Sequence, residues 1–307
     1  MKKNTAILFL THFTDSEIIA QYNNIENDCD NEFDIILLYD NTRSDFNPFS
    51  YSDSDRLRYF TFTLNDLRGM SYQKIKNIST TRNVINNRRI ANNAEIPILL
   101  FYLKNPHYSY YWVVEYDVRF TGSWNDFFSY FSNNDADLLG TTLFRYDVRP
   151  NWTHWHFLKT PGRKLEKADL IRGFLPIYRI SNRALAQLHY AYMDGWTGHP
   201  EVTIPTILKY SGFRIEDIGG DGEFVDHKNL NRFYRNTPKN EGLSPGTFVF
   251  RPVIPHPGDE RGKIWHPVKV PSREGMIKAP KNLRYQAKRL LKKLLGRFFF
   301  QCFPGQA

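Results

Sequence analysis

Two carboxylates stand two residues apart at the end of an apolar run. Glu115 and Asp117 close the run Tyr110–Tyr116, whose aromatic and β-branched residues predict a buried strand. Residues i and i+2 of a strand share one face, so we expect both side chains to point the same way. Adjacent carboxylates repel each other unless protons or a cation lie between them, and their oxygens suit Mg²⁺ or Mn²⁺. The pair predicts a divalent-metal site, and a solvated strand end with incidental acids is the alternative.

The flanking sequence predicts the sheet that would position this pair. We expect strands at Thr5–Leu10, Asp34–Tyr39, Leu57–Thr63, Tyr110–Tyr116, Asp137–Phe144, Leu175–Ile180 and Phe213–Ile218. We expect helices capped by Ser16, at Thr81–Asn93, near Trp124–Phe131, from Ser181-Asn182 to Met193, and at Val202–Tyr210, while Ile98–Leu103 fits a strand or a buried helix. Strands that alternate with helices predict an α/β fold, a mostly parallel sheet flanked by helices. Ligands of such sheets bind at the carboxyl ends of the strands.

Three strand ends together carry a resemblance to a known fold. Thr11-His12 follow the first strand, Asp40 closes the second, and Glu115-Tyr116-Asp117 closes a later one. Over residues 3–269 this arrangement resembles the GT-A fold of glycosyltransferases, which is Rossmann-like and carries a D-x-D-type motif. Here Glu takes the first place of that motif.

The resemblance implies transfer of a sugar from a nucleotide-diphosphate sugar, with a UDP-sugar favoured, to a saccharide or lipid-linked acceptor. The likeness is strongest to bacterial members that act on surface polysaccharides. It implies that Asp117 ligates the metal and that Glu115 contacts the metal, its waters or the ribose. The same resemblance puts Thr11, His12 and Asp40 on the donor side.

A histidine near the end of the body lies between two lysines, in Lys263-Ile-Trp-His266-Pro-Val-Lys269. Several GT-A families return a late histidine to the metal, so the resemblance implies that His266 is a ligand. It also implies that Lys263 and Lys269 contact the diphosphate. A neutral imidazole suits Mn²⁺ better than Mg²⁺. A surface histidine in a proline-containing loop is the alternative.

The second half of the chain holds a candidate general base. Glu201 follows Gly198-His199-Pro200 at the start of a predicted helix, where the helix dipole favours a carboxylate even without a function. An inverting transfer needs a carboxylate to take the acceptor's proton. The resemblance places that group beyond the metal motif, which implies Glu201. The competitors are Asp194 and the pair Glu216-Asp217.

Acceptor contacts are expected from Arg172 and Gly173, because glycine permits a close approach of the backbone. Aromatic rings can stack on sugars, which makes Trp196, with Trp152 and Trp155, a candidate acceptor platform. Packing in the core or at its rim is the alternative for each of them.

Composition narrows the class of protein. Of the 307 residues 41% are hydrophobic and 24% charged, which excludes wholesale disorder. The two cysteines form no disulfide or zinc pattern, so a reducing compartment is expected. The apolar run after Met1-Lys2-Lys3 is too short for a signal peptide, and no stretch approaches a membrane span. We therefore expect a cytoplasmic protein.

Nearly all of the net charge lies in the last residues. Residues 277–307 carry +8 of the total +9, with eight basic residues and no acidic one. Leucines recur there at helical spacing among lysines and arginines, which predicts a basic amphipathic helix on an anionic membrane surface. The protein would then be peripheral on the inner face of the membrane. A docked helix with a solvated basic face is the alternative.

The predicted organisation is a catalytic domain over residues 1–276 and a tail over residues 277–307. The domain divides near residue 120 into a nucleotide-binding half and an acceptor half. Two other functions remain open. A metal-dependent hydrolase would explain Glu115, Asp117 and His266, and a nucleic-acid-binding protein would explain the tail. The body, however, is nearly neutral and has no recognition motif, so no nucleic acid is expected.

Overall fold

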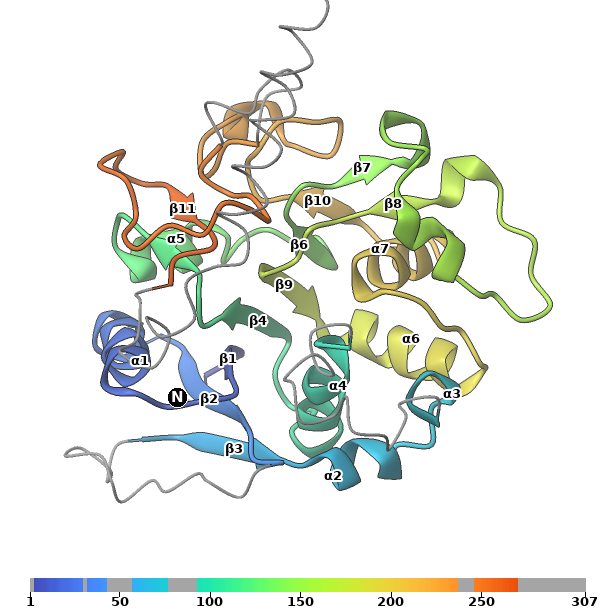
Figure 1. The fold of residues 1–307 in the computed structure, drawn as a ribbon, viewed down its shortest axis with the longest axis horizontal. Coiled ribbons are helices and arrows are strands. Elements are labelled where there is room, and N and C mark those ends of the chain that lie inside the picture. Colours follow the sequence, from blue (N-terminus) through green and yellow to red (C-terminus); the bar gives the residue numbers. More distant parts are fainter. Residues whose placement is uncertain (1–2, 30–31, 43–56, 77–92, 237–245, 270–307) are drawn as a thin grey trace, which may run out of the picture. The chain divides into compact units, whose positions relative to one another are not determined.

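The computed structural model describes residues 3–29, 32–42, 57–76, 93–236 and 246–269 (Figure 1). Its centre is a seven-stranded sheet with the order β10-β6-β9-β4-β1-β2-β3. The strands are β1 (Thr5–Thr11), β2 (Asp34–Asp40), β3 (Tyr59–Phe62), β4 (Tyr110–Glu115), β6 (Leu138–Gly140), β9 (Ile177–Ser181) and β10 (Ile215–Asp217). Every neighbouring pair is parallel except the two pairs made by β9, which runs antiparallel to β4 and β6. The expected mostly parallel α/β sheet flanked by helices is confirmed.

The central strands are apolar on both faces because each face has its own core. In β1, Ala6, Leu8 and Leu10 belong to one hydrophobic cluster. Ile7 and Phe9, which alternate with them, belong to the other. A strand buried on both faces reads as a continuous apolar run, which is the pattern from which β1 and β2 were predicted.

Helices cover both faces of the sheet (Figure 1). They are α1 (Ser16–Cys29), α2 (Leu64–Gly69), α3 (Gln73–Lys76), α4 (Glu95–Lys104), α5 (Trp124–Tyr130), α6 (Asn182–Met193) and α7 (Pro200–Tyr210). Buried residues of α1 and α5 join the cluster of Ile7, whereas those of α4, α6 and α7 join the cluster of Leu8. Ser181 caps α6 as expected, because its side chain accepts a hydrogen bond from the Ala184 N–H.

Three local expectations are refined by the structure. The segment around Ile98 is helical, as α4. Asp15 rather than Ser16 caps α1, since its Oδ1 accepts from the Ile18 N–H at 2.9 Å. The strand expected over Asp137–Phe144 is only β6, because Thr142 adopts a left-handed conformation (φ 53°) that turns the chain toward β7 (Phe144–Arg145). The helix expected at Thr81–Asn93 lies outside the described residues, apart from Asn93.

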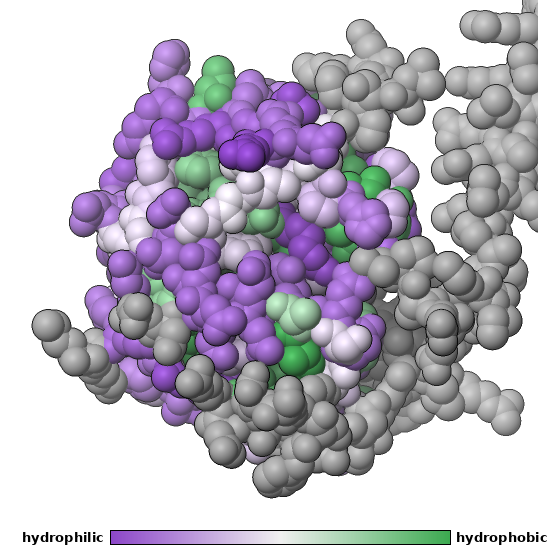
Figure 2. All heavy atoms as spheres, turned by 90° about the vertical axis from the view of Figure 1, so that its left-hand side faces the viewer, coloured by the Kyte–Doolittle hydropathy of each residue, from purple (hydrophilic) through white to green (hydrophobic). Residues whose placement is uncertain are grey.

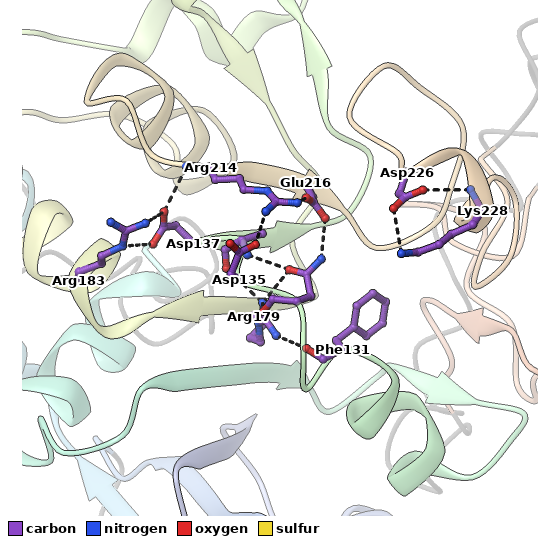
Figure 3. Close-up of polar contacts among 11 residues, drawn as sticks. Phe131, Asp135, Asp137, Arg179, Arg183, Arg214, Glu216, Asp226 and Lys228 are labelled. Atoms are coloured by element: carbon purple, nitrogen blue, oxygen red, sulfur yellow. Dashed lines mark hydrogen bonds and ion pairs between the residues drawn. The ribbon is translucent and has the colours of Figure 1, made fainter.

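Ion pairs and hydrogen bonds link residues on and next to β6, β9 and β10 (Figure 3). Asp137 is buried and accepts from the Arg183 guanidinium through both oxygens, each at 2.6 Å. Arg214 bonds Asp135 and Glu216, and the Arg179 guanidinium donates to the Phe131 carbonyl at 2.6 Å. These charged side chains stabilise the short strands at one edge of the sheet.

The chain divides into two compact units, residues 1–253 with 257–268, and residues 254–256 with 269–307. The tail expected over residues 277–307 lies outside the described residues. Figure 2 shows the first unit from the side of α1, α5 and β11 (Ile264–Trp265), where its surface is largely hydrophilic. None of the helices in the described ranges is both long enough and apolar enough to cross a bilayer.

Candidate functional site

The two predicted acids lie where β4 ends in a tight turn. Glu115 is the last residue of β4, and the Val118 N–H donates to its carbonyl at 3.0 Å. This turn holds Asp117, which is buried, next to Glu115. On either side of β4 run β1 and β9, so the pair sits at the carboxyl end of a central strand.

Pairing of two short strands brings His266 to this turn. The strand β5 (Arg119–Phe120) begins two residues after Asp117 and pairs antiparallel with β11, with Arg119 opposite Trp265. In that register Asp117 and His266 come close although many residues separate them in the sequence. A hydrogen bond of 2.8 Å from the Val268 N–H to the Asp117 carbonyl extends the pairing.

Ligand atoms of Glu115, Asp117 and His266 all lie within 4.8 Å of one another. The His266 Nδ1 lies 2.8 Å from the Val249 carbonyl, which can only accept, so this nitrogen carries the proton. The Nε2 of the same ring is 3.5 Å from Asp117 Oδ1. Two carboxylates and an imidazole nitrogen converge in a largely buried site, and a divalent cation fits this donor set.

Arg119 positions the turn that carries the acids. Its guanidinium donates to the Tyr116 carbonyl at 2.7 Å and to the Val118 carbonyl at 3.1 Å, and it pairs with Glu17 at 3.2 Å. Burial lowers the pKa of Arg119, while nearby Glu17 and Asp117 oppose that change. Sequence reasoning overlooked this residue, although a basic side chain two positions after the acidic pair was a usable signal.

The expected donor-side residues lie at or just after the carboxyl ends of β1 and β2. Thr11 ends β1, and its hydroxyl bonds the Phe13 carbonyl at 2.7 Å. The His12 ring packs against Tyr116, with centroids 5.3 Å apart. Asp40 ends β2 and accepts from the Thr42 N–H and hydroxyl at 3.0 and 2.6 Å. One edge of the sheet therefore collects Thr11, Asp40 and Glu115, as the topology of parallel strands predicts.

The two lysines have different surroundings. The amine of Lys263 donates to the carbonyls of Asn231 and Arg232, at 2.8 and 2.7 Å. Lys269 belongs to the second unit, where its N–H donates to the Ile254 carbonyl at 2.9 Å. Their proposed contact with a diphosphate stays a prediction.

A second group of polar side chains forms around Glu201, in the first turn of α7. Its carboxyl lies 3.7 Å from the Nδ1 of His199, the residue that caps the helix. Burial raises the pKa of Glu201 to about 7, and the nearby Arg172 guanidinium partly opposes that shift. A carboxyl group with such a pKa can accept a proton near neutral pH.

Other predicted acceptor-side residues have structural contacts. Asp194 is half-exposed and pairs with Arg163 at 2.6 Å. Asp217 is buried and accepts from the Tyr234 hydroxyl and from the N–H groups of Gly219 and Gly220. Trp196 is only 2% exposed, so its ring packs in the core.

The segment 172–174 connects the two groups. Arg172 ends β8 (Ile171–Arg172), and the Gly173 N–H donates to the Glu201 carbonyl at 2.7 Å. The next residue, Phe174, packs its ring against His266, with centroids 5.1 Å apart. One short segment therefore touches both the candidate metal site and the candidate base.

Comparisons with known proteins add little about activity. A family profile described as "Protein of unknown function (DUF3405)" matches residues 60–137, less than half of the chain. No curated protein matches the sequence. Among solved structures, an apo form of mouse xyloside xylosyltransferase 1 is 9% identical with a TM-score of 0.36, covering 68% of this chain and 81% of its own. The galactosyltransferase LgtC, in complex with donor and acceptor sugar analogs, is 10% identical with a TM-score of 0.36, covering 70% and 74%.

Proposed function

We propose that this protein is a divalent-metal-dependent glycosyltransferase that uses a nucleotide-diphosphate sugar. The observation that carries the proposal is the group of Glu115, Asp117 and His266 at the carboxyl end of β4. Ligand sites of open α/β sheets lie at that end of the strands, and Thr11 and Asp40 end β1 and β2 there. A cation held by these side chains would neutralise negative charge on a leaving diphosphate.

Glu201 supplies the proton acceptor for this reaction. The acceptor hydroxyl oxygen forms a bond to the anomeric carbon, and the bond from that carbon to the diphosphate breaks. The hydroxyl proton passes to the Glu201 carboxylate, and the nucleoside diphosphate leaves with the bonding electrons. This role requires an inverting reaction, in which the acceptor attacks the face opposite the leaving group. The raised pKa of Glu201, about 7, supports it.

The finer identity of the partners rests on the sequence. The imidazole of His266 favours Mn²⁺ over Mg²⁺ as the ion. We propose a UDP-sugar as the donor and a saccharide or glycolipid as the acceptor, in synthesis of cell-surface polysaccharide. The basic residues after position 276 support a peripheral place on the cytoplasmic face of an anionic membrane.

The test is the binding of UDP-, GDP-, CMP- and dTDP-sugars, measured as a rise in unfolding temperature with and without Mn²⁺. We expect one donor class to stabilise the wild-type protein only when Mn²⁺ is present. Asp117→Asn should abolish this stabilisation, because it removes one of the two ligand charges, and should leave the fold intact. The matched control is Asp126→Asn, which alters an exposed acid in the first turn of α5.

Two results would overturn the proposal. One is a donor that binds Asp117→Asn with unchanged metal dependence. The other is rapid Mn²⁺-dependent cleavage of phosphate esters without any binding of a nucleotide sugar, which would indicate a hydrolase.

A further inference from the structure

Within the described part of the chain, Arg172 has a largely buried guanidinium group without a hydrogen-bond partner. Its Nε is enclosed and bonds nothing, and among the described residues the side chain makes no hydrogen bond or ion pair. Its guanidinium carbon lies 4.6 Å from the centre of the Trp152 ring, which fixes its position without satisfying its N–H donors. Buried polar groups almost always have partners, so a guanidinium like this one requires an explanation.

The charges around Arg172 make the missing partner an anion. Arg149 and Arg172 are close enough to repel each other, and burial together with this repulsion lowers the pKa of Arg172 to about 10. The carboxyl of Glu201 is the nearby acid, but it is partly protonated at neutral pH because its own pKa is about 7. The surrounding segment 145–172 has seven basic and three acidic residues. An anion on Arg172 would relieve an unfavourable concentration of positive charge.

Aromatic rings lie near Arg172. The His154 ring stacks on His199 with centroids 4.0 Å apart, and the Nδ1 of His154 is buried and bonds none of the residues that the structure describes. Phe157 follows, 59% exposed, with its ring 6.0 Å from His154. A ligand at Arg172 therefore meets hydrogen-bond donors on one side and an exposed aromatic face on the other. Sugars present both hydroxyl groups and apolar C–H faces, so a charged sugar suits this surface better than a free anion.

We propose that Arg172, with Arg149 beside it, binds the carboxylate or phosphate of an acidic saccharide, which is the acceptor of the reaction. A guanidinium group can donate two parallel hydrogen bonds to two oxygens of either a carboxylate or a phosphate. Anchoring the acidic group at Arg172 places a neighbouring hydroxyl near Glu201, two residues into α7. This assignment rests on the proposed transfer reaction, but binding of the acid does not require it.

The experiment measures binding of four probes to the full-length protein by titration calorimetry at constant ionic strength, without metal or nucleotide. The probes are glucuronate, glucose 6-phosphate, glucose and inorganic phosphate. We expect one of the acidic sugars to bind at least about 10-fold more tightly than glucose, and Arg172→Met to lose about 10-fold to 100-fold of that affinity. Arg149→Gln, at an exposed position, should lose about 2-fold to 5-fold of that affinity.

The matched control is Lys164→Gln, which removes one positive charge from the same segment at a side chain that is 91% exposed. It should leave the affinity unchanged. The stronger of the two acidic sugars identifies carboxylate or phosphate as the recognised group. Three results would overturn the proposal. The first is glucose that binds as tightly as both acidic sugars, and the second is an equal loss of affinity in Lys164→Gln and Arg149→Gln. The third is inorganic phosphate that binds as tightly as either acidic sugar. Because no donor is present, these outcomes are independent of the test of transferase activity.

Discussion

The proton affinity of Glu201 is set by its surroundings in space. The carboxyl group lies on α7, with His199 before it in the chain and Arg172 facing it from β8. Burial disfavours the ionised form and raises the pKa of Glu201 to about 7, and the positive charge of Arg172 partly opposes that shift. A helix start with an acid in the first turn would ordinarily predict the opposite direction.

We expect the turnover number to rise with pH through about 7, because only ionised Glu201 can take the acceptor's proton. Glu201→Gln should lower turnover by about 10²-fold to 10⁴-fold and remove that inflection, with donor affinity little changed. The measurement is a pH–rate profile of both proteins. Asp194→Asn is the control, since Asp194 is the half-exposed competitor and should keep the profile. Parallel loss of donor affinity and turnover in Glu201→Gln would assign Glu201 to binding instead.

The same pKa also affects stability. A carboxyl group whose pKa is higher in the folded state makes the folded protein bind more protons, so its contribution to stability is complete at low pH. It is lost as pH rises through about 7. The unfolding temperature should therefore fall less between pH 5 and pH 8 in Glu201→Gln than in the wild type, because glutamine does not ionise.

At the scale of elements, the candidate metal site depends on a two-stranded pairing outside the main sheet. β5 continues from the turn after β4, and β11 pairs with it from a distant part of the chain. The Ile264 side chain of β11 is fully buried, and its N–H donates to the Phe233 carbonyl at 2.7 Å. These contacts hold His266, the residue directly after β11, beside Asp117.

Replacing His266, whose imidazole follows β11, should weaken metal binding without unfolding the protein. We expect His266→Ala to bind Mn²⁺ about 10-fold to 100-fold less tightly than the wild type. Manganese affinity can be measured by electron paramagnetic resonance of free Mn²⁺. His227→Ala, at an exposed histidine, is the matched control. Equal Mn²⁺ affinity in His266→Ala and the wild type would show that His266 has only a structural role.

At the scale of the whole molecule, charge is distributed very unevenly. Residues 277–307 carry +8 of the net +9. Each basic residue near an anionic membrane contributes about 1 kcal/mol of attraction, and buried leucines would add to it. The hypothesis that this segment binds membranes comes from the sequence alone, because the segment lies outside the described residues.

Deleting residues 277–307 should leave a folded protein that still binds its donor but no longer sediments with anionic liposomes. High salt should weaken sedimentation of the full-length protein, because screening reduces the electrostatic part, and zwitterionic liposomes should bind much less. The control is a DNA and RNA mobility assay, since a nucleic-acid-binding tail would shift those probes and ignore lipid composition. Unfolding of the truncated protein, or no sedimentation of the full-length protein, would contradict the prediction.

Much of the sheet could be predicted from local sequence. Continuous apolar runs marked β1, β2 and β4, because strands buried on both faces need no polar alternation. The end of the apolar run placed Glu115 and Asp117 together at one strand end, but β4 stops at Glu115 and Asp117 lies in the turn that follows, so the expected shared strand face is not what brings the two acids together. Those inferences use only contacts between residues that are near one another in sequence.

The rest was decided by tertiary structure. Nothing local shows that His266 meets Asp117, because that contact depends on the register of β11 against β5. The segment around Ile98 was ambiguous between strand and helix, and packing of its apolar residues against the sheet selected the helix. The pKa of Glu201 and the enclosure of the Arg172 Nε, which bonds none of the described residues, likewise arise from burial, which depends on which parts of the chain cover a residue. Sequence alone therefore determined where acids stand along the strands, and only the folded chain determined which distant side chains complete their sites.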